Sequence, residues 1–399
     1  MRNITGAPVE GSDYFERPRE LAALTRELKN AANIRINAPR RLGKTSLVLR
    51  LCEEWRSQGG AAVFVNVEDT VDELSLTEKL LEALRSAGLQ PDLSTRCLQS
   101  IEKVRSALGP AKVATGAGID LVLEGAGGGA GLSLGRALEN VISKVEQGEK
   151  HVLIAIDEMP EALLALSKVE GGSERVARFL HWLRALRQSF RRKVRWVFLG
   201  SIGMDGFVEE RLLGKTINDL TSVPLDALSE EEALAFLSRL AADNGLKIAE
   251  EQQREIIERV GWPLPYHLQI AVHAFLSLGV TTVDQSAIEQ AWNHLLRPES
   301  LTQFDTWRQK LDEQFSVPMA ANAKAVLNHV CQFPDGRSRG DLLSVLVAMH
   351  PSKNPDDLAE ILARLLQLLQ RDGFLLEKDS SYSFRSFLLR EYWYRRNIR

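Results

Sequence analysis

Short, continuously apolar segments alternate with helical segments over the first half of the chain. Continuous apolar runs are typical of strands buried on both faces of a parallel sheet. Alternation of such strands with helices predicts an α/β fold class with a three-layer, doubly wound parallel sheet. Strands are expected at residues 33–37, 61–68, 151–158, 195–201 and, at an edge, 221–225, and helices at 18–30, 46–55, 74–87 and 176–190.

The pattern becomes helical from Ser229 onwards. Ser229 and Glu232 have the spacing of a capping box, and helical segments continue to Leu296. The last hundred residues predict further helices, including 355–371, and then a β-hairpin formed by 373–377 and 381–385. We therefore expect an all-helical lid followed by a winged-helix-like domain, with domain limits at 1–226, 227–300 and 301–399.

Length and composition support an intracellular protein of several domains. A chain of 399 residues exceeds what one core usually holds. Three distant cysteines argue against a disulfide framework, and seven scattered histidines predict no structural metal. No apolar run reaches the length of a membrane span, and residues 1–13 lack the apolar core of a signal peptide. The expected location is the cytoplasm, with no membrane partner.

The segment 35–46 matches a phosphate-binding loop in all but its first glycine, which Ala38 replaces. The N–H groups of such a loop, followed by a helix N-terminus, form a positive nest for phosphates. Gly43 lets the backbone approach, Lys44 reaches the β and γ oxygens, and Thr45 offers a hydroxyl to Mg²⁺. The predicted nucleotide contacts are Pro39, Arg40, Arg41, Leu42, Gly43, Lys44, Thr45 and Ser46.

Two carboxylates end the predicted strand 151–158. Open α/β sheets bind ligands at the carboxyl ends of their strands. Asp157 is expected to share the Mg²⁺ shell with Thr45, and Glu158 to polarise the attacking water as general base. Ser201 ends the strand 195–201 and is a candidate γ-phosphate sensor, although its hydroxyl could simply terminate that strand. The predicted catalytic residues are Lys44, Asp157, Glu158 and Ser201.

The glycine-rich segment 109–135 is the least regular part of the sequence. It contains no Gly-Lys pair, so a second phosphate loop is not expected. Its apolar pieces, 117–123 and 130–134, predict a flexible hairpin or loop insertion that is a candidate partner contact.

Five arginines interleave with aromatic residues between Phe384 and Arg399, against Glu391 alone. Such a tail can meet phosphate backbones. It can equally be a terminal helix whose aromatic side chains pack inward and whose arginines face water, which is the reading we weight higher. The net charge of −3 excludes a globally basic nucleic-acid binder.

The predicted helix 355–371 takes the place of a recognition helix, with the hairpin as the wing. Most of its leucines have core spacing, and its exposed face includes Asp356, Asp357 and Glu360. Duplex DNA repels carboxylates. The predicted winged-helix fold favours binding of nucleic acid, whereas the acidic face of this helix does not.

Together these residues resemble the prokaryotic AAA-type P-loop ATPases related to the STAND and origin-recognition groups. In that group a nucleotide domain precedes a helical lid and a winged helix. The resemblance is carried by residues 14–17 with 20–21, 38–46, 157–158, 200–204 and 261–263.

The resemblance implies further site residues. Phe15 and Arg17 would lie near the adenine and phosphates, and Pro263 would close the adenine pocket from the lid. Residues 214–216 occupy the neighbourhood where such families carry an arginine finger, and Arg211 is the nearest arginine. Without a finger, slow turnover is expected.

Three functions are compatible with these features. The first is a molecular switch in which ATP and Mg²⁺ bind between the sheet domain and the lid. Hydrolysis to ADP and phosphate then reorients the lid and winged helix for assembly with a protein partner or a second copy. The alternative is an ATP-gated DNA-binding initiator, transposition or repair regulator. The third, a scaffold that binds nucleotide without hydrolysis, is disfavoured because both the Lys44–Thr45 and Asp157–Glu158 pairs are complete.

Overall fold

The computed structural model describes residues 1–114, 118–123, 132–200, 204–209, 211–300 and 302–398. The chain forms two compact units. The sheet unit comprises Glu16–Ala38 and Lys44–Leu225, and the helical unit comprises Met1–Phe15, Pro39–Gly43 and Asp226–Arg399. The three domain limits expected from the sequence stay a prediction.

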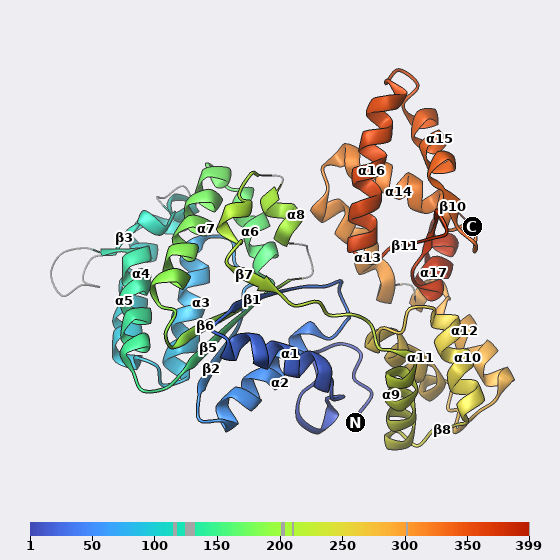
Figure 1. The fold of residues 1–399 in the computed structure, drawn as a ribbon, viewed down its shortest axis with the longest axis horizontal. Helices are drawn as coiled ribbons and strands as arrows, with labels where there is room; N and C mark the ends of the chain where they lie inside the picture. Colours follow the sequence, from blue (N-terminus) through green and yellow to red (C-terminus); the bar gives the residue numbers. More distant parts are fainter. Residues whose placement is uncertain (115–117, 124–131, 201–203, 210, 301, 399) are drawn as a thin grey trace. The chain divides into compact units, whose positions relative to one another are not determined.

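A five-stranded parallel sheet forms the centre of the sheet unit (Figure 1). The strand order is β2-β5-β6-β1-β7, and every neighbouring pair is parallel. The predicted parallel α/β sheet is therefore confirmed, with β7 at an edge and Pro224 beyond its end. The strands are β1 (Asn33–Asn37), β2 (Ala61–Asn66), β5 (Val152–Asp157), β6 (Val194–Gly200) and β7 (Leu220–Ser222).

Helices cover both faces of this sheet (Figure 1). One face packs against α1 (Pro18–Lys29) and α2 (Lys44–Ser57). On the other face, strand side chains such as Ile154 and Trp196 join helix residues such as Leu80 and Phe179 in one buried cluster. The helices on that face are α3 (Glu73–Ser86), α5 (Leu134–Gln147), α6 (Met159–Ser167) and α7 (Gly172–Ser189).

The glycine-rich segment departs partly from expectation. Helix α4 (Pro91–Ala114) continues past Gly109 and Pro110, where irregular chain was expected. Strong helix formers on both sides, Ala107–Leu108 and Ala111–Lys112, outweigh these two breakers. Beyond it lie η2 (Gly118–Asp120) and an antiparallel pair, β3 (Val122–Leu123) with β4 (Leu132–Ser133). Residues 115–117 and 124–131 lie outside the described chain, so the flexibility expected there stays a prediction.

The sheet unit ends with short elements beyond β6. These are α8 (Met204–Glu209) and η3 (Gly214–Thr216), which precede the edge strand β7.

Within the helical unit, the stretch from Asp226 to Leu296 contains four α-helices. Ser229 and Glu232 form the predicted capping box, with Ser229 N–H donating to Glu232 Oε2 at 2.8 Å. The expectation of an all-helical lid needs a correction, because the chain after α9 pairs with the chain after α11 as two short parallel strands, β8 (Lys247–Ile248) and β9 (Thr282–Val283). The helices are α9 (Glu230–Asp243), α10 (Glu250–Val260), α11 (Pro265–Ser277) and α12 (Gln285–Leu295).

The C-terminal part combines helices with a small antiparallel sheet of order β10-β12-β11. The predicted hairpin is present, and its turn places Asp379 and Ser380 at positive φ. The elements are η4 (Pro298–Ser300), α13 (Thr302–Gln314), α14 (Val317–Val330), β10 (Arg337–Ser338), α15 (Arg339–Met349), α16 (Pro355–Arg371), β11 (Leu375–Lys378), β12 (Ser381–Phe384) and α17 (Phe387–Asn397); the N-terminal segment of the unit adds η1 (Gly11–Asp13).

The arginine-rich tail is the packed helix α17. Tyr392 and Trp393 are fully buried. The Tyr392 hydroxyl donates to Asp305 at 2.6 Å, and Trp393 Nε1 donates to Asn328 at 2.8 Å. For Tyr392 and Trp393, the alternative of inward-packed aromatic side chains is the one observed, whereas Phe387 is exposed.

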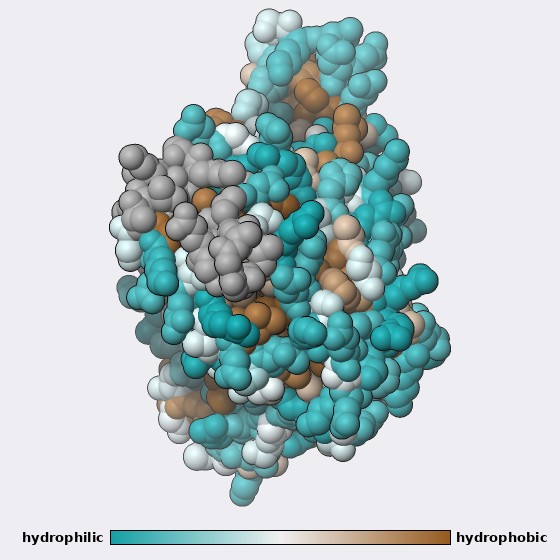
Figure 2. Space-filling model, turned by 90° about the vertical axis from the view of Figure 1, so that its left-hand side faces the viewer, coloured by the Kyte–Doolittle hydropathy of each residue, from teal (hydrophilic) through white to brown (hydrophobic). Residues whose placement is uncertain are grey.

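Figure 2 shows a mostly hydrophilic face with small, scattered hydrophobic areas. Within the described ranges, no helix combines the length and apolar character that crossing a bilayer requires.

Candidate nucleotide site

The phosphate-loop sequence connects β1 to α2, as predicted. Lys44 opens α2, is 6% exposed, and its Nζ donates to the Ala38 carbonyl at 2.7 Å, so the ammonium folds back across the loop. Gly43 has φ of 84° and Arg41 has φ of 72°. Ala38 keeps φ in the ordinary negative range, so this position does not require the missing glycine.

Asp157, at the end of β5, meets the start of α2. Thr45 Oγ1 donates to Asp157 Oδ2 at 2.7 Å, and the backbone N–H of Glu158 donates to Asp157 Oδ1 at 2.9 Å. The Asp157 side chain is almost completely buried. Burial raises its pKa, and the Glu158 charge raises it further, while the Thr45 bond and Lys44 oppose the shift.

These two side chains fit a magnesium ion. Mg²⁺ prefers hard oxygen ligands and in nucleotide sites takes one or two protein oxygens together with phosphate oxygens. The Thr45 hydroxyl and the Asp157 carboxylate supply such oxygens within 2.7 Å of each other. A desolvated carboxylate with a raised pKa also gains from a nearby cation.

Glu158 sits at the strained start of α6. Its φ and ψ of 57° and 36° are left-handed, and Pro160 occupies the first turn of the helix. A residue other than glycine in this conformation is held there by its surroundings. One such constraint comes from β6, because a Cβ at Gly200 would lie 2.3 Å from Pro160 Cδ. The end of β6 therefore packs directly on the segment that carries Glu158.

Sequence reasoning missed Asp205, which joins α8 to the end of β1. Arg35 Nη1 lies 2.6 Å from Asp205 Oδ1, and Asn37 Nδ2 donates to Asp205 Oδ2. The available signal was Asn37, a polar residue that ends β1 directly before the loop.

The remaining predicted contacts lie in several places. Arg17 is buried in front of α1, and its Nη2 donates to Glu20 at 2.6 Å. Phe15, in the helical unit, lies edge-on to Phe236 with ring centroids 5.2 Å apart. Pro263 belongs to the helical unit, and its carbonyl accepts from Leu228 N–H at 3.2 Å. The adenine roles of these residues stay predictions, and Ser201 lies outside the described chain.

The middle of the phosphate loop contacts other parts of the helical unit. The Arg41 guanidinium lies 4.1 Å from the centre of the Tyr266 ring. Leu42 is buried, as is Ser46 in the sheet unit. No sequence pattern indicated that Tyr266 contacts Arg41.

Arginines that were candidates for contacts with a neighbouring site or with nucleic acid contact nearby residues of the same chain. Arg211 lies 3.9 Å from the ring of Phe207, and its Nη1 donates to the Phe207 carbonyl at 3.2 Å. In the tail, Arg390 pairs with Glu391, and Arg396 lies 3.7 Å from Asp305.

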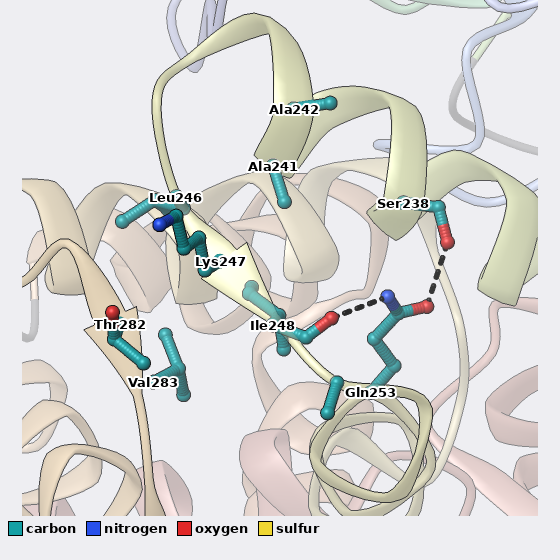
Figure 3. Close-up of a pocket in the computed structure, with 10 residues that line it drawn as sticks. Ser238, Ala241, Ala242, Leu246, Lys247, Ile248, Gln253, Thr282 and Val283 are labelled. Atoms are coloured by element: carbon teal, nitrogen blue, oxygen red, sulfur yellow. Dashed lines mark hydrogen bonds between the residues drawn. The ribbon is translucent and has the colours of Figure 1, made fainter.

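A cavity of about 500 Å³ lies beside β8 and β9 (Figure 3). Ser238 Oγ donates to Gln253 Oε1, and Gln253 Nε2 donates to the Ile248 carbonyl, each at 2.9 Å. Apolar residues such as Leu246 and Val283 line most of the rest, together with Lys247 and Thr282. None of the predicted site residues lines this cavity.

Comparison with known proteins agrees with this fold. Residues 5–90 match the family described as AAA-like domain. No curated protein matches the sequence.

Two solved structures resemble almost the whole chain. The Walker-type ATPase PABY2304 of Pyrococcus abyssi superposes with a TM-score of 0.63 at 16% identity, covering 98% of this chain and 99% of that one. The ORC2 protein of Aeropyrum pernix, solved as ADPNP–ADP complexes, gives 0.56 at 14% identity, covering 95% and 93%. The fold is thus that of an AAA-type P-loop ATPase followed by a helical C-terminal region.

Proposed function

We propose that this protein is an ATP-binding and ATP-hydrolysing molecular switch. The observation that carries the proposal is the 2.7 Å contact between Thr45 Oγ1 and Asp157 Oδ2. It unites the phosphate-loop helix with the acidic strand end, which are the two halves that nucleotide hydrolysis requires. The ADPNP–ADP complexes of the structurally similar ORC2 protein support an adenine nucleotide.

Each residue has a defined part in this proposal. Lys44 releases Ala38 and binds the β- and γ-phosphate oxygens, because an ammonium gains more from phosphate charge than from one carbonyl. Thr45 and Asp157 would hold Mg²⁺, which would neutralise charge on the phosphates. Glu158 orients a water molecule and accepts its proton as that water attacks the γ-phosphorus, while the bond from this phosphorus to the β–γ bridging oxygen breaks and ADP leaves with that oxygen.

The switch acts through the helical unit. Contacts to the γ-phosphate favour one arrangement of the chain, and their loss on hydrolysis releases it. The C-terminal helices with the β10-β12-β11 sheet would form the winged-helix domain that assembles with a protein partner or a second copy. Turnover without a partner is expected to be slow, since Arg211 is engaged with Phe207.

DNA is the less favoured partner. The residues Asp356, Asp357 and Glu360 are exposed at the start of α16, where a recognition helix would approach phosphates. Two tail arginines that an initiator would use, Arg390 and Arg396, are paired with carboxylates.

The test is phosphate release from ATP with Mg²⁺, for the wild type and Lys44→Ala, over a range of protein concentrations and with or without duplex DNA. We expect slow release that Lys44→Ala abolishes and that DNA does not change. Stimulation by DNA would favour the initiator, and a steep concentration dependence would indicate a site completed by a second copy. Release by the wild type that equals release by Lys44→Ala would refute the proposal.

A further inference from the structure

Three distant segments of the helical unit converge beside the phosphate loop. Gly373, between α16 and β11, has φ of +82°, and a Cβ there would lie 2.6 Å from two atoms of the Trp262 ring and 3.0 Å from Pro39 Cγ. The entry of the loop, the turn between α10 and α11, and the C-terminal hairpin therefore meet at one point. Only glycine fits at position 373.

Trp262 is held firmly at this junction. Its side chain is 5% exposed, and the Arg385 guanidinium lies 4.3 Å from its ring centre. Next to it, Gly261 has φ of +76°, and a Cβ there would lie 2.7 Å from the Phe387 ring. The C-terminal segment 385–387 thus fixes the turn on which Trp262 sits.

A second contact holds the middle of the loop. Arg41 stacks on Tyr266, which lies in the first turn of α11 and is 7% exposed. A guanidinium gains most from an aromatic face when water is excluded from that face. The Arg41–Tyr266 stack meets this condition.

The loop needs such support because its backbone is strained. Arg41 adopts φ of 72°, a left-handed conformation that disfavours any residue with a Cβ. Positive φ angles at Arg41 and Gly43, on either side of Leu42, are also typical of a loop that turns its N–H groups toward an anion. A contact that fixes the Arg41 side chain fixes this backbone.

We propose that Tyr266 and Trp262 are positioning residues for the phosphate loop, which hold Arg41 and Pro39 so that the loop keeps its anion-binding conformation before nucleotide arrives. The inference rests on the proposed nucleotide function. It assigns to the segment 261–266 a role in binding phosphate through the loop, in addition to the adenine-side role that Pro263 was expected to have. Through Gly373, the C-terminal part of the chain sets nucleotide affinity.

The first experiment is titration of the intact protein with a non-hydrolysable ATP analogue and Mg²⁺. Tyr266→Leu removes the ring face, and we expect Kd to rise about tenfold, the effect of losing a desolvated cation–π contact. Tyr266→Phe keeps the ring face and should bind within about twofold of the wild type. Because Arg41 is the other member of the stack, adding Tyr266→Leu to Arg41→Gln should change Kd no further.

The second experiment uses a matched pair of glycines. Gly373→Ala drives a methyl group into Trp262 and Pro39, and we expect it to weaken analogue binding. Gly279 has φ of +69° and open space around its Cβ position, so Gly279→Ala carries the same backbone strain without the collision. It should bind the analogue as the wild type does.

The outcomes separate this inference from the proposed function. If the wild type binds the analogue and Lys44→Ala does not, while Tyr266→Leu and Gly373→Ala bind like the wild type, the positioning role is wrong and the site stands. If the wild type itself does not bind the analogue, both the positioning role and the proposed nucleotide function are refuted. Should Tyr266→Leu fail to fold, Arg41→Gln takes its place, and its binding like the wild type would contradict the inference.

Discussion

The proposed site contains one buried carboxylate, that of Asp157. Asp157 accepts hydrogen bonds from Thr45 and from the Glu158 backbone, yet burial still raises its pKa. A charge held in such a place lowers the stability of the empty protein and strengthens the binding of a cation. We therefore expect stability and function to oppose each other at this residue.

Asp157→Asn should stabilise the protein without nucleotide and abolish turnover. The amide oxygen still accepts from Thr45, and the buried charge is gone. The expected rise in Tm of the sheet unit is about 2–4 °C, which corresponds to roughly 1 kcal/mol in a unit of this size. Differential scanning calorimetry without Mg²⁺ and ATP measures it.

The pH dependence provides the control for that measurement. A raised pKa means that the folded protein keeps the Asp157 proton to a higher pH than the unfolded chain does. The free energy of unfolding of the wild type therefore falls as pH rises from the ordinary pKa of aspartate to the raised pKa of Asp157 in the folded protein. The free energy of unfolding of Asp157→Asn should not fall in this range. A stability difference that is equally large below the ordinary pKa of aspartate would contradict the assigned cause.

At this scale, motif spacing anticipated that Lys44 and Thr45 open a helix that meets Asp157 at a strand end, because a phosphate loop and an acidic strand end are local sequences. The roles of the three residues in binding and hydrolysis stay predictions. Motif spacing was insufficient for Tyr266 and Trp262. Tyr266 contacts Arg41, and Trp262 lies with Pro39 beside Gly373. Arg41 and Pro39 are more than 200 residues away in the chain, and only the folded structure brings them to this place.

Among the elements, the junction of β6 with α6 positions the predicted base. Gly200 ends β6 against Pro160, which follows Glu158 by two residues. The strand end and the helix start form one packed unit.

Gly200→Ala should disturb this junction. The added methyl group overlaps Pro160, and overpacking of this kind typically destabilises by about 1–3 kcal/mol. Since Glu158 precedes Pro160, phosphate release should fall by more than analogue binding does. Gly214→Ala is the control, because a Cβ at that position meets nothing within 4 Å. Equal effects of the two variants on turnover would refute the assignment.

Elements with a strong pattern were predictable, and short or contradictory ones were not. The continuous apolar runs predicted β5 and β6, and the leucine spacing indicated that the helix 355–371 is mostly core. The strands β8 and β9 have two residues each, too few to show any periodicity. The end of α4 was not predicted, because Gly109 and Pro110 are helix-breaking residues and indicated irregular chain despite the helix formers around them.

Across the whole molecule, the two units do not follow sequence order. The helical unit includes the N-terminus, where the Met1 amino group pairs with Asp243 and the Asn3 amide donates to the Gln269 carbonyl at 3.0 Å. Domain limits drawn along a sequence cannot reveal such pairings, because contacts decide which segments belong together.

His267 lies where three parts of the helical unit meet. Its ring is fully buried near Phe304 and Trp307, and Nδ1 lies 3.4 Å from Ser386 Oγ. Burial lowers the pKa of His267 to about 3, and the Arg41 charge contributes in the same direction. The folded unit therefore holds this histidine neutral.

The stability of the helical unit should consequently depend on pH. A lowered histidine pKa contributes stability that is present above the unfolded value of about 6.5 and is lost as pH falls toward the folded value. The expected slope is about 1.4 kcal/mol per pH unit. Urea unfolding at pH 7.5 and 5.5 measures it, and His267→Gln should remove that part of the slope. If the free energy of unfolding of His267→Gln depends on pH as strongly as that of the wild type, groups other than His267 cause the pH dependence.

The most direct test of the central claim is Glu158→Gln. The amide retains the size of the side chain but cannot accept a proton, so binding of ATP with Mg²⁺ should match the wild type while phosphate release is lost. Binding is measured by titration and release in a single turnover with excess enzyme. Release at the wild-type rate by this variant would contradict hydrolysis at the proposed site.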